Sequence, residues 1–249
     1  MNTPLTAPHF ARIFSLFVLA LLLGFAKPAQ AGEFAERRIL GFSPDGRYFA
    51  FEQFGVQDGS GFPYADIFLV DTATDEWVGG SPFRVRLRDE RAQLKEARKE
   101  ALNRAGDLLR KLAISEPGRL LASNPPGELS ADPYRVEVNV SQIAGGAPDR
   151  RTFTLEETAL ANARCAAFTA MPIKGFRLTT QRQDSAPQVL HSDTSIPKSR
   201  GCPLRYAISD IIVFEAGAGR RVFAILVSVY ALGFEGPDRR FMAITRALN

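Results

Sequence analysis

Residues 42–77 alternate apolar and polar side chains between tight-turn signals, and this pattern constrains the fold more than any other in the chain. The run Ser43-Pro44-Asp45-Gly46 is typical of a type I turn, because proline presets φ at the second position and glycine accepts the left-handed conformation that follows. Apolar alternation on both sides predicts a β-hairpin, and the segment ADIFLVD predicts a third strand. One such meander cannot bury both of its faces, so it must pack against other sheets.

The last third of the chain is its most apolar part and supplies a partner for that meander. Strands are predicted at RYAISDIIVFE, RRVFAILVSVYALGF and GPDRRFMAIT. When Arg47 is aligned with Arg221 and Pro63 with Pro237, without gaps, the turn, the loop proline and the strands of the two ends coincide. An internal β repeat and two unrelated β-meanders both explain this correspondence. In either case we expect the two ends to shield each other's apolar faces.

Between the two ends the apolar period becomes helical. Leu94, Ala97 and Ala101 begin a stripe that recurs at threes and fours, which predicts a helical insertion at about residues 87–115, packed by its alanine face. Strands resume at YRVEVNVSQI, RTFTLEE and GFRLTTQRQ, whereas residues 183–203 are predicted to be irregular. The predicted fold class is mainly β, with antiparallel meanders in an abbreviated propeller-like or sandwich arrangement and one long inserted α-helix.

The N-terminus predicts export. A basic start, the apolar run IFSLFVLALLLGF and the triplet Ala29-Gln30-Ala31 are typical of a signal peptide over residues 1–31. The alternative is an uncleaved anchor, but the apolar run has thirteen residues and a spanning helix needs about 20. We therefore expect residues 32–249 to form a single β-rich domain, periplasmic or secreted, with no transmembrane segment.

Cys165 and Cys202 are the only cysteines. In an oxidising compartment an even number of cysteines predicts a disulfide, with two free buried thiols as the alternative. No Cys-x-x-Cys pattern occurs and residues 32–249 keep a single histidine, His191, so no metal or other cofactor is predicted.

Two resemblances accompany these patterns. Ser43-Pro44-Asp45-Gly46, followed by the strand from Asp66, resembles one repeat of the TolB-type propellers, which implies local geometry. The combination of GFSPDGRYFAFEQFGVQDGSGFPYADIFLVD near the start and GFEGPDRRFMAIT at the end resembles a bacterial family of predicted secreted proteins of unknown function. That resemblance implies export and gives no catalytic residues to carry over.

The loop GVQDGSGFPY is the first candidate contact surface. It offers Asp58 and an aromatic rim of Phe54, Phe62 and Tyr64, and rigid aromatic rings dominate binding energy at interfaces. The alternatives are a long hairpin connection capped by aromatics and a partial calcium loop, for which only Asp58 and Ser60 would qualify.

The segment FEGPDRRF is the second candidate. Adjacent residues on a strand point to opposite faces, so one of Arg239 and Arg240 could pair with an acid while the other meets a partner. A structural salt bridge is the alternative interpretation.

These observations favour an exported, periplasmic, non-enzymatic protein that binds a protein or envelope partner and no nucleic acid. The alternative is a secreted carboxylate-dependent hydrolase of envelope carbohydrate, using acids such as Glu52, Asp66 and Glu235. A Ser–His–Asp relay would have to use His191, whose neighbours in HSD cannot form one among themselves.

Overall fold

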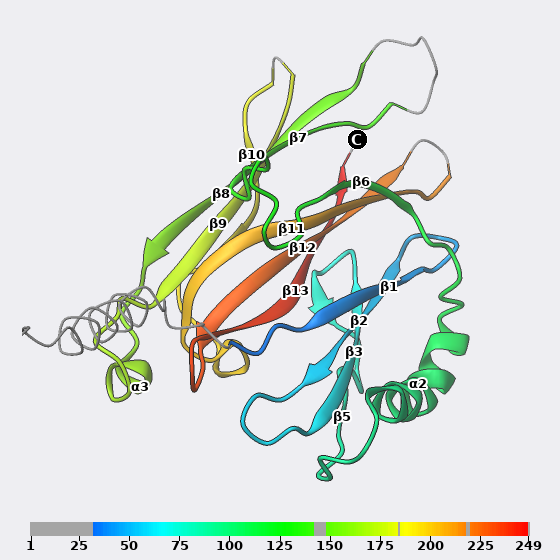
Figure 1. The fold of residues 1–249 in the computed structure, drawn as a ribbon. Coiled ribbons are helices and arrows are strands. Elements are labelled where there is room, and N and C mark those ends of the chain that lie inside the picture. Colours follow the sequence, from blue (N-terminus) through cyan, green and yellow to red (C-terminus); the bar gives the residue numbers. More distant parts are fainter. Residues whose placement is uncertain (1–31, 142–147, 184, 218–219, 249) are drawn as a thin grey trace, which may run out of the picture. The chain divides into compact units, whose positions relative to one another are not determined.

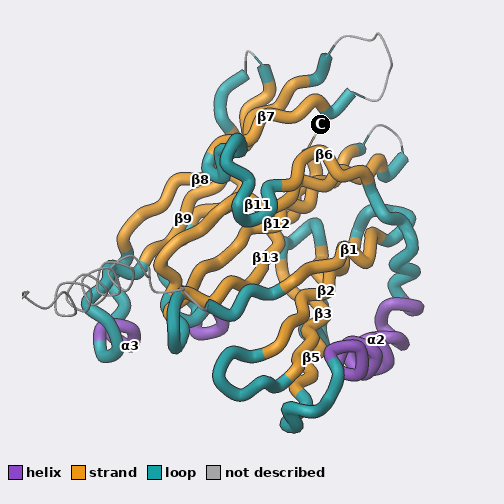
Figure 2. Tube along the Cα trace, viewed as in Figure 1, coloured by secondary structure: helices purple, strands orange, loops and turns teal. Residues whose placement is uncertain are grey.

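The computed structural model describes residues 32–141, 148–183, 185–217 and 220–248, and residues 32–249 form one compact unit. The predicted signal peptide lies outside the described residues. Three antiparallel sheets and helix α2 are stacked in layers (Figures 1 and 2). This confirms the mainly β fold class with one long helix, and the sheets take the sandwich arrangement.

The three sheets are called the N-terminal, central and outer sheets. The N-terminal sheet contains β1 (Glu36–Phe42), β2 (Tyr48–Val56), β3 (Pro63–Asp71), β4 (Glu76–Trp77) and β5 (Phe83–Arg86). The central sheet runs in the order β13 (Pro237–Leu248), β12 (Arg221–Leu232), β11 (Pro203–Glu215) and β6 (Arg119–Ser123). The outer sheet runs in the order β10 (Gln188–Ser192), β9 (Lys174–Arg182), β8 (Arg150–Ala159) and β7 (Arg135–Asn139).

The first hairpin forms as its turn chemistry predicts. Gly46 has φ of 66° and its amide donates to the Ser43 carbonyl at 2.8 Å. The Ser43 hydroxyl donates to Asp45 at 2.6 Å, and this hydrogen bond lowers the pKa of Asp45. Strands β1 and β2 then pair from Glu36 opposite Phe54 to Phe42 opposite Phe49.

The central sheet is buried on both faces, which explains its nearly continuous apolar sequence. On β12, the even-numbered Val222, Ala224 and Leu226 share a core with β1–β3. The alternate residues of the same strand share a second core with the outer sheet, namely Phe223, Ile225, Val227 and Val229. The first of these cores also contains aromatic side chains from the N-terminal strands, namely Phe42, Phe49, Phe51 and Phe68. The expectation that the two ends of the chain shield each other is confirmed.

Helix α2 (Leu94–Lys111) covers the other face of the N-terminal sheet. Its alanines Ala97, Ala101 and Ala105 are fully buried, as the stripe predicts. A capping box at Gln93 fixes where the helix begins. Residues 87–93 form a loop and the helix ends at Lys111, so it is shorter than the predicted insertion at about residues 87–115.

The prediction of an irregular segment at 183–203 is wrong in part, because Gln188–Ser192 form β10 along β9. Only Leu190 of this short edge strand is buried, so its apolar pattern is too weak to read from sequence. Strands β5 and β6 also escaped prediction and are only four and five residues long.

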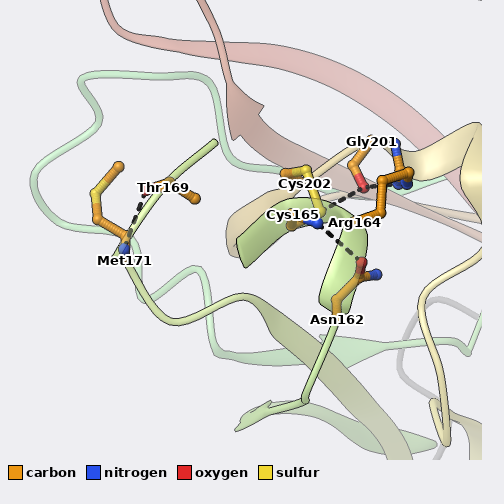
Figure 3. Close-up of a disulfide and its surroundings, with 7 residues drawn as sticks. All are labelled: Asn162, Arg164, Cys165, Thr169, Met171, Gly201 and Cys202. Atoms are coloured by element: carbon orange, nitrogen blue, oxygen red, sulfur yellow. Dashed lines mark hydrogen bonds between the residues drawn. A yellow bond between two sulfur atoms is a disulfide. The ribbon is translucent and has the colours of Figure 1, made fainter. Parts of the chain in front are cut away.

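The disulfide between Cys165 and Cys202 is present, as predicted (Figure 3). It joins the short helix α3 (Ala163–Ala166) to the residue before β11, after the 3-10 turn η1 (Lys198–Arg200). The Asn162 side chain caps α3 by accepting from the Cys165 amide at 3.1 Å, and Arg164 donates to the Gly201 carbonyl at 2.8 Å. The bridge thus fixes a loop of the outer sheet to the central sheet.

Candidate functional site

A groove of about 940 Å³ lies where the edges of the three sheets meet. Strand β13 is the edge of the central sheet, β10 is the edge of the outer sheet, and β4 and β5 lie along the edge of the N-terminal sheet. Residues of all four strands line it. The volume is in the range of small-molecule sites, which are usually concave and partly apolar.

The floor of the groove is aromatic. The rings of Phe51 and Phe68 stack with centroids 4.8 Å apart, and Trp77 follows at 5.8 Å from Phe68. Phe51 and Phe68 are almost fully buried, whereas 48% of Trp77 is exposed. Trp77 is the only tryptophan of the chain, so its fluorescence reports on this groove.

A row of three arginines forms one wall. Arg84 and Arg86 lie on the groove face of β5, opposite Asp66 and Tyr64 of β3, and Arg88 follows two residues later. Alternate residues of a strand share a face, so Val85 between them points the other way, into the core under α2. All three arginines are exposed, and none makes an ion pair with a carboxylate in the described part of the chain. We call Arg84, Arg86 and Arg88 the arginine row.

The remaining cations of the groove are held by protein partners. Arg240 pairs with Glu33 and places its guanidinium 4.7 Å from the Tyr64 ring. Arg200 pairs with Asp193 at 2.5 Å, and Arg246 donates to the Leu190 carbonyl at 3.0 Å.

His191 of β10 lines the outer-sheet side of the groove. It shares Asp193 as a partner with Arg200. Its Nε2 lies 2.9 Å from Asp193 Oδ1. Burial raises the pKa of Asp193, but the hydrogen bonds from His191 and Arg200 outweigh it, so the pKa is lowered overall. Asp193 therefore stays charged and holds the Arg200 guanidinium and the His191 ring in place.

Two carboxylates face six arginines among the described residues that line the groove. Burial raises the pKa of Asp66, against the hydrogen bond that Gln53 donates at 3.0 Å and the charges of nearby arginines. Burial likewise raises the pKa of Asp75, which accepts from the amide and the hydroxyl of Thr245 at 2.7 and 2.9 Å. The groove therefore carries an excess of positive charge that falls on the arginine row.

The free edge of β13 is already occupied by hydrogen-bond partners. Its outward amides at Arg239, Phe241 and Thr245 donate to the Glu33 carbonyl at 2.8 Å, to Gln53 Oε1 at 2.9 Å and to Asp75 Oδ1 at 2.7 Å. An added peptide strand needs such amides free. Recognition in the groove must therefore come mainly from side chains.

The structure brings together two of the residues predicted from sequence, Tyr64 and Arg240, at one end of the groove. Burial raises the pKa of Tyr64 above its ordinary value. Asp58 and Phe62 lie in the loop just before Tyr64, where Asp58 is exposed.

The other two predicted residues lie away from the groove. Arg239 is buried, donates to the Ala35 carbonyl at 2.8 Å and lies between the rings of Phe34 and Phe241. Phe54 packs under the Arg98 guanidinium of α2 at 3.7 Å.

Sequence reasoning missed the arginine row and Trp77. The signal was present in RVRLR, where arginines alternate with apolar residues as they do on a strand with one basic face. Its connection to a tryptophan seven residues earlier depends on both β4 and β5 pairing with β3, and no local pattern shows that pairing.

The three acids proposed for a hydrolase do not converge. Glu52 is fully buried on the helix side of the N-terminal sheet, where it accepts hydrogen bonds from Arg98 at 2.9 and 3.0 Å and forms an ion pair with Arg38 at 2.9 Å. Asp66 lies on the opposite face, in the groove, and Glu235 lies in the exposed β12–β13 loop.

Within the described ranges, no group of three or more His, Cys, Asp or Glu side chains is arranged to hold a metal ion. Over the same ranges, no helix is long and apolar enough to cross a membrane.

Among curated proteins, none matches this chain. A family model described as predicted secreted protein (DUF2259) matches residues 50–246, which include the arginine row and nearly all the strands. The predicted export of the chain agrees with this description. The resemblance to a family of predicted secreted proteins of unknown function, expected from the sequence, is confirmed. The chain belongs to the DUF2259 family of predicted secreted proteins.

Proposed function

We propose that this exported protein is a non-enzymatic binding protein that holds an anionic component of the envelope in the groove between its three sheets. The arginine row is the observation that carries the proposal. Three exposed guanidinium groups share one wall and have no carboxylate partner among the described residues. Guanidinium groups bind carboxylate and phosphate oxygens through paired, charge-assisted hydrogen bonds.

The surroundings of the row strengthen such contacts. An aromatic floor excludes water and lowers the local dielectric constant, which strengthens a hydrogen bond to a charged group. Arg84 already lies 5.8 Å from the Trp77 ring, so an anion bound there would sit beside an apolar surface.

The loop at residues 57–62 is proposed to contribute at the rim. It leads directly into Tyr64, which lines the groove beside Arg240. Asp58 and Phe62 are thus close to the end of the groove where the arginine row ends, and a large ligand or a partner protein delivering it would contact them.

A carboxylate-dependent hydrolase is the second candidate and has weaker support. Asp66 and Asp75 line the groove, and burial raises the pKa of each. Asp75, however, is engaged by Thr245, which leaves Asp66 without a second free carboxylate among the described lining residues. Release of sugar from envelope carbohydrate by the purified protein, abolished by Asp66→Asn, would favour this candidate.

The proposal is tested with probes that differ only in charge. Inositol hexakisphosphate and neutral inositol share one ring, and Trp77 fluorescence or calorimetry measures their binding to the purified protein. We expect the hexakisphosphate to bind, more weakly as salt rises, and inositol not to bind. The R84Q/R86Q/R88Q variant should lose at least about tenfold in affinity.

A matched control removes the same charge elsewhere. The exposed arginines Arg91, Arg135 and Arg177 lie outside the groove lining. The R91Q/R135Q/R177Q variant loses the same net charge as the row variant, and its affinity for the hexakisphosphate should stay within about twofold of the wild type. Equal loss in the two triple variants would reduce the effect to net charge and contradict the proposed site.

A further inference from the structure

The arginine row and the aromatic floor are neighbours in the same groove and meet where Arg84 contacts the Trp77 ring at 5.8 Å. From this juxtaposition we propose that the ligand is a single anionic amphiphile, whose acidic head group binds the arginine row and whose alkyl or acyl chain lies over Phe51, Phe68 and Trp77. The inference rests on the proposed function and names the ligand class for the same groove.

Strand register gives the groove two distinct ends. Along β3, Tyr64 lies opposite Arg86 and Asp66 opposite Arg84, whereas Val70, six residues beyond Tyr64, lies opposite Trp77. A strand rises about 3.4 Å per residue, so Val70 lies about 20 Å from Tyr64, but the Arg84 guanidinium reaches the Trp77 ring at 5.8 Å. Arg86 and Arg88 therefore mark the basic end of the groove, and the aromatic part begins where Arg84 contacts Trp77.

Contacts with β13 confirm this direction. Arg240 lies over Tyr64 at the basic end, and Thr245 is held by Asp75 at the aromatic end. Phe241 lies between them, where its amide donates to Gln53. The edge of β13 thus runs beside the groove from one end to the other, and its outward amides are engaged at both ends and at Phe241.

The aromatic end has apolar surface to offer. Trp77 keeps 48% of its surface exposed although its ring contacts Phe68, whereas Leu190 and Ile244 line the groove but are already buried. A hydrophilic anion would leave the exposed part of Trp77 against water. An alkyl chain would cover it, with a gain of about 25 cal/mol for each Å² removed from water.

Two other occupants fit the groove less well. An acidic peptide adding as a strand would need the β13 amides that Gln53 and Asp75 already engage. A membrane surface would need the row on a convex face, whereas Arg84 and Arg86 line a concavity together with residues of the two other sheets.

A homologous series of alkyl phosphates from ethyl to decyl, kept below micelle-forming concentrations, tests the inference by titration of Trp77 fluorescence in the full exported protein. We expect affinity to rise about two- to fourfold for each added methylene until the chain fills the floor. Affinity that does not change with chain length, while inositol hexakisphosphate still binds, would overturn the amphiphile and leave the proposed function intact. If neither probe class binds, the proposed function itself fails.

Two variants distinguish binding of the ligand's acidic head group from binding of its alkyl chain. W77Q, measured by calorimetry, should flatten the chain-length dependence of alkyl phosphate binding, because Trp77 supplies the half-exposed apolar surface of the floor. R84Q/R86Q/R88Q should weaken every member of the series by a similar factor. Vesicles containing phosphatidylglycerol supply the remaining outcome: binding to vesicles without binding to dispersed decyl phosphate would mean surface docking and would overturn a single-molecule site.

Discussion

The two faces of the N-terminal sheet differ in whether their arginines have carboxylate partners. Under α2, the fully buried Glu52 accepts hydrogen bonds from Arg98 and forms an ion pair with Arg38, so both arginines of that face share a carboxylate partner. On the groove face, Arg84 and Arg86 have no carboxylate partner among the described residues. We infer that arginine serves stability on the first face and ligand binding on the second.

Neighbouring residues of β2 show how little sequence separates the two roles. Glu52 and Gln53 are adjacent, yet Glu52 points to the helix and Gln53 to the groove, where it bonds Asp66 and the Phe241 amide. The alternation of a strand alone decides which face a charge serves. A one-residue change of register would place Glu52 in the groove and cancel part of its positive charge.

The largest expected effect comes from removing the compensated charge. Glu52→Gln leaves the two guanidinium groups of Arg38 and Arg98 without their carboxylate, and we expect a loss of about 3 kcal/mol in the free energy of unfolding. Urea denaturation measures it. The matched control is Glu137→Gln, which breaks the exposed pair with Arg150 and should cost less than about 0.5 kcal/mol. If Glu52→Gln and Glu137→Gln cost equally little, the arginine pairs under α2 do not serve stability, and the two faces do not differ as inferred.

A second prediction concerns the packing of α2 on the same face. Ala101 is fully buried against the sheet, so Ala101→Leu should cost about 2 kcal/mol through overpacking. Thermal or urea unfolding measures the change. The exposed Asn103, two residues further along the helix, offers the control, since Asn103→Leu should shift stability by less than about 0.5 kcal/mol. A tolerated Ala101→Leu would mean that the helix is loosely attached.

A third, smaller effect depends on pH. Because burial raises the pKa of Asp66 in the folded protein, the stability that its protonated form contributes is fully present below the unfolded pKa and is lost as pH rises through the folded pKa. Asp66→Asn should therefore be more stable than the wild type at pH 7, and the difference should shrink as the pH falls toward 4. Unfolding curves at several pH values measure it. A difference that grows on acidification would contradict the burial of a charged Asp66 in the groove.

The smallest expected change is in the stability of the row variant. Because the arginine row has no ion pairs to lose among the described residues, R84Q/R86Q/R88Q should unfold within about 0.5 kcal/mol of the wild type. Urea denaturation checks this value. A loss comparable to that of Glu52→Gln would show that these arginines serve stability, and the two faces would no longer differ.

Local patterns predict much of this fold and little of its site. The turn at Ser43–Gly46, the alternation of β2 and β12, and the alanine stripe of α2 are written in consecutive residues, and each forms as expected. The disulfide also follows from composition and compartment.

The groove could not be predicted in the same way. It combines residues near Arg84, His191 and Arg240, which lie on the edges of three different sheets, and their approach depends on the order of the layers. Tyr64 and Arg240 were identified because each is conspicuous in its own loop or strand. Their contact arises from the packing of the N-terminal sheet on the central sheet, which no spacing in the sequence encodes.

The central claim is that the uncompensated face of the N-terminal sheet is the ligand site. A crystal structure of the protein with decyl phosphate tests it most directly. The account predicts the phosphate within hydrogen-bonding distance of Arg84 or Arg86 and the alkyl chain over Phe68 and Trp77. A phosphate bound instead to the basic residues of α2, with the groove unchanged, would contradict it.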